Sequence, residues 1–373
     1  MRSTLATLLL ILVVLFAGAQ TQYNYNVPCG TDYYFVAPGF GNILWSSNSD
    51  TAVDVNFFDL QLKKNFYITA VRSKSNMQSF YASSDSLYSV SFEMNESGTL
   101  TMLLIEEKGM EEKTIEFTRK SSSEAISIDY VCFYAHRAIY FDAEEGGRDS
   151  VVMELQHRYP MPAKGTPRTD SIRFVKAMTS HQEGLPVEFT YPADMAKNSD
   201  IRWIQDYTSM YETGEAEIID YSANWQIDEQ TIVILQKNGL LGFVESNYEY
   251  AGGAHGVYSS FYYIYNFKTD TLLQLADLFV DNFEPALEEL INKQIRIDFE
   301  ISDDAMLSEE GFFVESIPVT SNFTFTDNGI LFLYNVYEVA PYVYGSIAVE
   351  IQFDAIKSLI RPHGPIEELI NTR

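Results

Sequence analysis

The chain has 373 residues, of which 46% are hydrophobic, a proportion too high for a disordered polypeptide. This length exceeds what one hydrophobic core usually serves, so two domains are expected. The 25 Lys and Arg against 52 Asp and Glu give a net charge of −27. Such a surface repels nucleic-acid phosphates and attracts cationic partners, so we expect no nucleic-acid ligand.

The first 19 residues predict a secretory signal peptide. Arg2 precedes an apolar run from Leu8 to Phe16, and Ala17 and Ala19 form the A-x-A pattern that signal peptidases recognise. The run is shorter than the about 20 residues that a spanning helix needs. We expect cleavage after Ala19, an extracytoplasmic location that is periplasmic or secreted, and no membrane span in the mature chain.

Residues 20–160 predict an antiparallel β domain. Several segments alternate apolar and polar residues with the period of two that is typical of half-buried strands. Examples are Ala52–Leu62, Ser86–Met94, Thr99–Glu106 and Ala125–Ala135. The sequence Asn95–Gly98 predicts a hairpin turn, and the proline-rich run Tyr159–Pro167 predicts a domain boundary.

Residues 161–373 predict an α+β domain with an antiparallel sheet and one main helix. Apolar residues in Asn282–Phe299 recur at the three-to-four spacing of a helix, and Met195–Tyr211 is a second helical candidate. Strands are expected at Glu188–Tyr191, Ala216–Gln226 and Val257–Phe267, among others. The predicted fold class of the whole chain is therefore α+β.

The chain contains two cysteines, Cys29 and Cys132. In an oxidising compartment we expect them to form a disulfide, and the alternative is two buried free thiols. The histidines are scattered, with no HxH or HxxxH pair, so we expect no metal site and no cofactor.

Three runs stand out in the second half: YEYAGGAHG at 248–256, LLQLADLF at 272–279 and YEVAPYVYG at 337–345. Their order and spacing resemble the extracytoplasmic C-terminal domain of unknown function shared by RsiV-type lysozyme-sensing anti-sigma factors and PdaC-type peptidoglycan deacetylases, with the small domain that precedes it. The resemblance implies a ligand-binding module of the bacterial cell envelope. It does not imply deacetylation, because the metal-binding motifs of a polysaccharide deacetylase domain are not found here.

Two groups of residues in these runs are candidates for function. His255 lies among glycines that could orient its ring, and Glu249 or Glu338 could support it as a general base. Alternatively, the glycines form a tight turn and His255 bonds the backbone. The second group is Tyr337, Glu338, Pro341, Tyr342 and Tyr344, which suit sugar stacking or a protein interface, unless they line the core beside the last strand.

From these observations we expect a soluble, exported binding protein without catalysis. Its predicted ligand-binding residues are Tyr250, His255, Tyr337, Glu338 and Tyr342. The predicted ligand is a cationic protein such as lysozyme, or a peptidoglycan-type glycan. The alternative is a cell-wall glycan hydrolase or deacetylase that uses His255 and nearby carboxylates.

Overall fold

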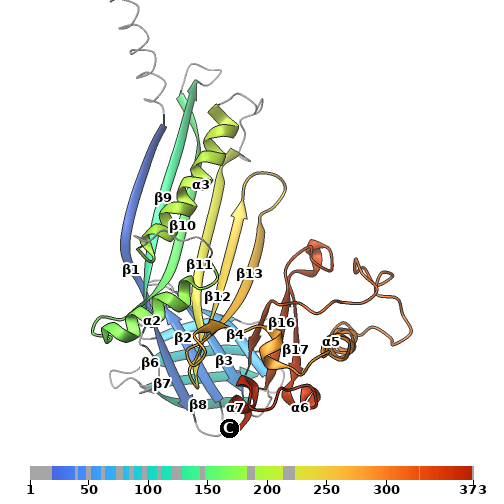
Figure 1. Ribbon diagram of the computed structural model, residues 1–373. Helices are drawn as coiled ribbons and strands as arrows, with labels where there is room; N and C mark the ends of the chain where they lie inside the picture. The colour runs from blue at the N-terminus through green and yellow to red at the C-terminus, as the bar shows by residue number, and fades with distance from the viewer. Residues whose placement is uncertain are drawn as a thin grey trace, which may run out of the picture.

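The structure is a computed structural model of the chain (Figure 1). It describes residues 19–37, 41–47, 52–59, 64–72, 79–83, 88–94, 99–106, 111–119, 126, 128–142, 148–182, 190–212, 223–326 and 328–371. The signal-peptide residues before Ala19 and the predicted turn Asn95–Gly98 lie outside these ranges.

The first half of the chain is built of strands. They are β1 (Ala19–Ala37), β2 (Gly41–Ser47), β3 (Ala52–Asp59), β4 (Lys64–Arg72), β5 (Ser79–Ser83), β6 (Tyr88–Met94), β7 (Thr99–Glu106), β8 (Glu111–Arg119), β9 (Ile128–Asp142) and β10 (Arg148–Pro162). All pairings among these strands are antiparallel, as the alternating sequence predicts.

Helices and strands are mixed in the second half. The elements are α2 (Arg168–Thr179), α3 (Ala193–Glu212), β11 (Trp225–Lys237), β12 (Leu240–Tyr250), β13 (Val257–Asn266), β14 (Thr271–Leu272), α4 (Leu275–Leu278), α5 (Glu284–Asp298), β15 (Phe323–Phe325), β16 (Gly329–Tyr334), η2 (Tyr342–Tyr344), β17 (Ile347–Gln352), α6 (Phe353–Ile356) and α7 (Pro365–Asn371). The α+β class is confirmed, but the described residues of this half form three long helices, α2, α3 and α5, where the sequence predicted one main helix.

Strands β1 to β8 form a closed ring. Each strand pairs with the next, and β1 pairs with both β2 and β8 around Phe35 and Val36. Phe92, Met102 and Ile115 are direct cross-strand partners and are buried at 1%, 0% and 2% exposure. Because neighbouring side chains on a strand point to opposite faces, these three mark the inner face of the ring.

The sheet continues from the ring into the second half of the chain. The order β14-β13-β12-β11-β10-β9-β1 is unbroken, so the paired strands cross the predicted boundary at Tyr159–Pro167. Tyr159 to Pro162 form the end of β10, and the chain turns only at Lys164 and Gly165. Proline is tolerated there because the strand is ending and fewer ladder hydrogen bonds are required.

β10 and β11 are parallel, unlike the antiparallel sheet expected for this part. A parallel pair needs a crossover connection, and α2 and α3 supply it. The predicted helix at Met195–Tyr211 is confirmed within α3. Of the strand predicted at Ala216–Gln226, residues 216–222 lie outside the described ranges, and Trp225 and Gln226 are the first residues of β11. The strand predicted at Glu188–Tyr191 is not observed in the two residues that the structure describes. Thr190 lies outside any strand and Tyr191 lies in a turn before α3, whereas residues 188 and 189 lie outside the described ranges.

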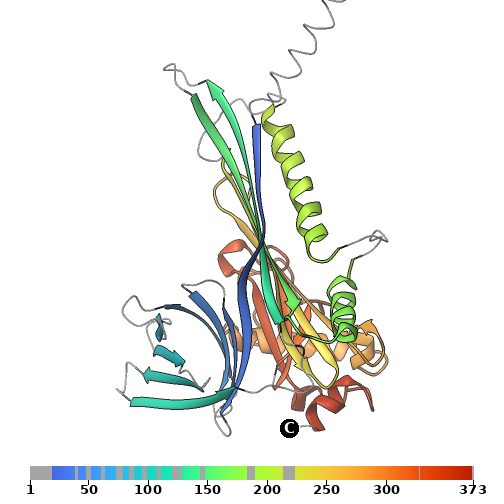
Figure 2. The same ribbon diagram turned by 90° about the vertical axis from the view of Figure 1, so that its left-hand side faces the viewer.

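α2 and α3 cover one side of the sheet, and the ring strands β2–β8 lie toward the other side (Figure 2). α3 buries Tyr207 against Trp225 and Ile227 of β11, together with Leu155 of β10. The intervening residues of the same strands face away from α3. The part of the sheet formed by β9, β10 and β11 therefore has one face that α3 covers and one face that α3 does not cover.

A second sheet, β15-β16-β17, packs with α5 in the C-terminal part. Leu287, Ile291 and Ile295 recur every four residues on α5 and are all fully buried. They pack in one cluster with Phe332 and Val349 of the sheet. The predicted helix at Asn282–Phe299 is thus confirmed, and its apolar stripe is worth about 1.5–3 kcal/mol for each fully buried side chain.

Two asparagine side chains close the part of the β13 edge that β14 does not pair with. Asn335 Oδ1 accepts from the Ser260 backbone N–H at 2.7 Å, and Asn335 Nδ2 donates to the Ser260 carbonyl at 3.1 Å. Asn322 Nδ2 donates to the same carbonyl at 2.8 Å, and its Oδ1 accepts from Tyr262 N–H at 2.8 Å. An amide side chain has the donor and acceptor of a peptide group, so these residues replace a neighbouring strand.

Cys132 is disulfide-bonded and only 2% exposed. The chain contains one other cysteine, Cys29, whose backbone neighbours Pro28 and Gly30 pair with Val131 and Tyr130 of β9. The Cys29–Cys132 pairing stays a prediction. Peptide mapping by mass spectrometry without reduction should yield one cross-linked peptide containing both residues, and two separate thiol peptides would contradict it.

Among the helices in the described ranges, none combines the length and hydropathy that crossing a bilayer requires.

Candidate functional site

The glycine-rich run forms the tight turn between β12 and β13. Gly252 and Gly253 have φ of 93° and 88°, a region that residues with a Cβ rarely adopt. Tyr250 closes the turn by donating its hydroxyl to the Gly253 carbonyl at 3.1 Å. His255 Nδ1 lies 2.9 Å from the Gly256 carbonyl, so this ring is hydrogen-bonded to the backbone of the neighbouring residue.

Rings from distant parts of the sequence meet beside this turn. The His255 ring stacks on Tyr342 of η2, with centroids 4.1 Å apart and planes 26° apart. Tyr258 and Tyr337 contact the same Tyr342 ring at 5.8 Å and 5.7 Å. The Tyr342 hydroxyl donates to the Gly256 carbonyl at 2.9 Å, which fixes η2 to the turn. Desolvation and the neighbouring tyrosines raise the Tyr342 pKa.

Tyr248 joins the group through a close approach to Gly256. A Cβ added at Gly256 would lie 2.6 Å from Tyr248 Cε2, so only glycine lets the ring pack there. Tyr248 and Tyr258 are 37% exposed and Tyr337 is 50% exposed. We call these five rings, His255, Tyr248, Tyr258, Tyr337 and Tyr342, the aromatic surface.

The structure therefore gathers three of the five predicted ligand-binding residues, His255, Tyr337 and Tyr342, into one surface. Tyr250 supports the adjoining turn. Glu338 is directed elsewhere, because its Oε1 accepts from Asn335 Nδ2 at 3.3 Å. Sequence reasoning missed Tyr248 and Tyr258, although Tyr248 shares the strand face of Tyr250, two residues away.

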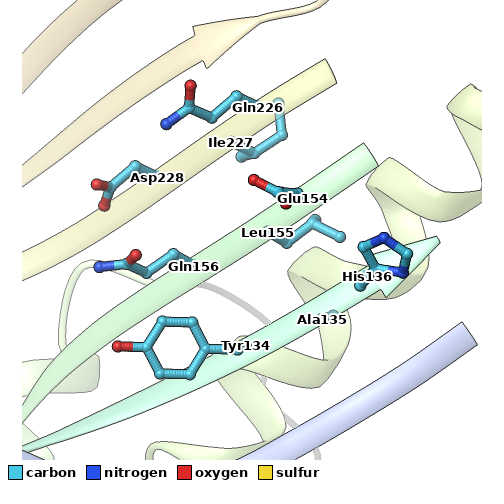
Figure 3. A pocket seen from close by; sticks show the side chains of 9 residues that line it. All are labelled: Tyr134, Ala135, His136, Glu154, Leu155, Gln156, Gln226, Ile227 and Asp228. Atoms are coloured by element: carbon cyan, nitrogen blue, oxygen red, sulfur yellow. The ribbon is translucent and has the colours of Figure 1, made fainter. Parts of the chain in front are cut away.

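The same side of the sheet carries a cavity of about 250 Å³ on β9, β10 and β11. Most of the residues that line it are polar or aromatic: Tyr134, His136, Glu154, Gln156, Gln226 and Asp228 (Figure 3). They alternate along the strands with Ala135, Leu155 and Ile227, which also contribute to the lining and belong to the buried cluster under α3. We call this cavity the sheet-face pocket.

Strand register joins the sheet-face pocket to the aromatic surface. Tyr134 is opposite Gln156, and Gln156 is opposite Asp228. Asp228 is opposite Tyr248, which is in turn opposite Tyr258. Because adjacent strands lie about 4.8 Å apart, Asp228 of the pocket lies about one strand spacing from Tyr248 of the aromatic surface.

Asp228 is the most perturbed group of the sheet-face pocket. Its Oδ1 is buried and has no hydrogen-bond partner among the described residues. Burial raises the Asp228 pKa; Gln230, His157 and Arg158 offset part of that increase, and Glu229 adds to it. A carboxylate in this position is stabilised by any donor or cation that enters the cavity.

A buried ionic network lies on the other side of the sheet, between α3 and the strands β10 and β11. His157 of β10 is 0% exposed; its Nε2 lies 2.7 Å from Asp200 Oδ1 of α3, and its Nδ1 lies 3.2 Å from Glu229 Oε2 of β11. Glu229 Oε1 also accepts from Ser199 Oγ at 2.8 Å and from Trp203 Nε1 at 3.2 Å. The network ties α3 to the parallel strand pair.

Opposing effects set the pKa values of this network. Burial lowers the His157 pKa, but its contacts with Asp200 and Glu229 outweigh burial and raise the value to about 9. For Glu229, burial raises the pKa, and its contacts with His157, Ser199 and Trp203 lower it to about 2. His157 is therefore an imidazolium at neutral pH, held between two carboxylates. The closed packing around it leaves it no access to a ligand.

His255 lacks the environment of a catalytic base. In the described part of the chain, its ring forms no ion pair with a carboxylate; the histidines that do are His157, His181 and His363. Glu249 alternates with Tyr248 and Tyr250 along β12 and faces the side of α3, where burial raises its pKa, Arg202 offsets part of that increase and Glu229 adds to it. Within the described residues, no group of three or more His, Cys, Asp or Glu side chains is placed to hold a metal ion.

Comparison with known proteins finds a family that is similar to the C-terminal part. Residues 276–354 match a family described as a protein of unknown function, DUF3298. This segment includes Tyr337, Glu338 and Tyr342, and the match confirms the predicted resemblance to a domain of unknown function. No curated protein matches the chain.

Two solved structures are similar to this chain. A DUF3298 family member from Bacteroides fragilis aligns over 68% of this chain and 100% of its own, with a TM-score of 0.54 and 22% identity. A DUF3298 family protein from Pseudomonas aeruginosa aligns over 61% of this chain and 94% of its own, with a TM-score of 0.39 and 18% identity. At this identity, the likeness to the first structure establishes a shared fold.

Proposed function

We propose that the protein is an exported, non-catalytic binding protein of the cell envelope that recognises its ligand with the aromatic surface. One observation carries the proposal: Tyr342 fixes three other rings beside the turn while leaving Tyr258 and Tyr337 37% and 50% exposed. A rigid tyrosine-rich surface provides apolar area and hydroxyl groups at a low entropy cost.

The ligand we propose is a cationic protein of the lysozyme type. The chain carries a net charge of −27, which would accelerate association with a positive partner and make it sensitive to salt. Tyrosines are enriched in the energetically dominant centres of protein interfaces. A peptidoglycan-type glycan is the alternative ligand, since the same rings could stack on sugars.

Replacing Tyr342 with alanine should weaken lysozyme binding at least about 30-fold, on the order of 2 kcal/mol. The substitution removes the ring on which His255, Tyr258 and Tyr337 pack. Calorimetric titration of the mature chain at low salt, with lysozyme in one series and peptidoglycan fragments in another, measures the effect.

The matched control is Tyr140→Ala, which removes a 41% exposed ring beyond His136 along β9. It should leave the affinity within about twofold. Absence of binding to both ligands at low salt would contradict the proposed function. Equal losses in Tyr342→Ala and Tyr140→Ala would show that the aromatic surface is not the binding site.

A further inference from the structure

We propose that the sheet-face pocket binds an organic cation, a guanidinium or ammonium group, between Glu154 and Asp228. Glu154 is exposed on β10, and Asp228 is half-buried on the adjoining β11. The register pairs Glu154 with Gln226 and Gln156 with Asp228, so the two carboxylates are diagonal neighbours. The proposal does not require the aromatic surface to bind a ligand, although Asp228 lies opposite Tyr248 in the sheet.

Charge favours a cation in this position. In the described part of the chain, neither Glu154 nor Asp228 forms an ion pair with a basic side chain. Asp228 Oδ1 is buried without a hydrogen-bond partner among the described residues, and the contact of the Asp228 carboxylate with the Gln230 side chain offsets only part of the effect of burial. A buried carboxylate oxygen without a donor is costly, and an entering N–H group would satisfy it.

The other lining groups suit a planar or multivalent donor. Gln156 and Gln226 can each offer an amide oxygen between the two carboxylates. Tyr134, 39% exposed at the end of the same row, offers a ring face to the cation. Diagonal residues on neighbouring strands lie about 7–8 Å apart, which leaves room for one guanidinium to bond both carboxylates.

Simple anions are a poor fit. Two basic side chains share this face: His136 lines the pocket opposite Glu154, and Arg158 is 2% exposed, with its guanidinium 4.1 Å from the centroid of the Tyr130 ring. Neutral sugars could use the same amides and the Tyr134 ring, but they would leave both negative charges uncompensated. The observations therefore favour a cation over a glycan.

Titration calorimetry at low salt tests the inference with N-acetylarginine amide, its uncharged citrulline analogue and the neutral sugar chitotetraose. The arginine compound should bind, and the citrulline compound should bind at least tenfold more weakly. The double variant Glu154→Gln/Asp228→Asn should weaken arginine binding at least tenfold with an unchanged melting temperature.

The matched control is Glu284→Gln/Glu289→Gln, which removes two exposed carboxylates from α5. If both double variants bind the arginine compound equally more weakly, the overall negative charge of the protein and not the pocket attracts the cation. That result would overturn the inference. Binding of chitotetraose in place of the arginine compound, lost in the pocket variant, would also overturn it by making the cavity a glycan site.

Titration with lysozyme shows whether the bound cation is a side chain of a docked protein or a free small molecule. If the pocket receives a basic side chain of a docked protein, the pocket variant should also bind lysozyme at least tenfold more weakly. If it receives free small cations, lysozyme affinity should not change. Loss of arginine binding in the pocket variant, with intact arginine binding in Tyr342→Ala, separates this inference from the proposed function.

Discussion

Replacing His157 with alanine should destabilise the folded protein by about 3–5 kcal/mol. The imidazolium is 0% exposed and lies between Asp200 and Glu229 at 2.7 Å and 3.2 Å. Its removal leaves two carboxylates close together in a buried site, with a void where the ring stood. Urea denaturation, followed by the fluorescence of Trp203 and Trp225 beside the network, measures the loss.

His363→Ala is the control for this prediction. His363 is 96% exposed in an ion pair with Glu367, and its loss should change stability by less than about 0.5 kcal/mol. If His157→Ala and His363→Ala have similar free energies of unfolding, the buried network does not contribute to stability.

The pH dependence gives a second measurement of the same network. The His157 pKa is raised to about 9 in the folded state, from 6.5, so its contribution is fully present below pH 6.5 and is lost as the pH rises through 9. The Glu229 pKa is lowered to about 2 from 4.5, so its contribution is present above pH 4.5 and is lost as the pH falls toward 2. The wild-type protein should lose stability between pH 7 and 9 more steeply than His157→Ala does.

The double substitution Asn322→Ala/Asn335→Ala should cost about 2–5 kcal/mol and promote self-association. It removes the partners of the Ser260 N–H and carbonyl and of the Tyr262 N–H, at about 1–3 kcal/mol for each group that stays buried. It also opens the edge of β13, and an open edge is a template for pairing with another chain. Urea denaturation measures the first effect, and light scattering with size-exclusion chromatography measures the second.

Asn247→Ala is the matched control, because Asn247 is exposed on β12, next to β13 in the sheet. It should alter stability by less than about 0.5 kcal/mol and leave the oligomeric state unchanged. If the double variant behaves like this control, the asparagine amides are not the groups that protect the edge.

Much of the fold was predictable because it depends on local periodicity. The alternation in Thr99–Glu106 predicted β7, and the four-residue apolar spacing around Leu287 and Ile291 predicted α5. The crossover between β10 and β11 was harder to predict. Tyr159–Pro162 reads as a linker by composition, yet these residues end a strand whose hydrogen bonds come from β9.

The candidate site was predictable only in part. Tyr337, Tyr342 and His255 stood out because they lie in unusual motifs, whereas Tyr134 and Asp228 lie in ordinary alternating strands. The alternation of β10 did place His157 on the inward face with Met153 and Leu155. That signal could have marked His157 as a buried group in need of a partner.

The sequence by itself determined the strand and helix periods, the glycine-rich turn and the acidic balance, because each depends on residues close together in the chain or on composition alone. The tertiary structure alone decided that Tyr342 stacks on His255, that Asp200 reaches His157 and that Glu154 lies diagonal to Asp228. These contacts depend on register and crossover, which are set by packing across the whole sheet. Periodicity shows which way a side chain points, and only the assembled sheet shows what it meets.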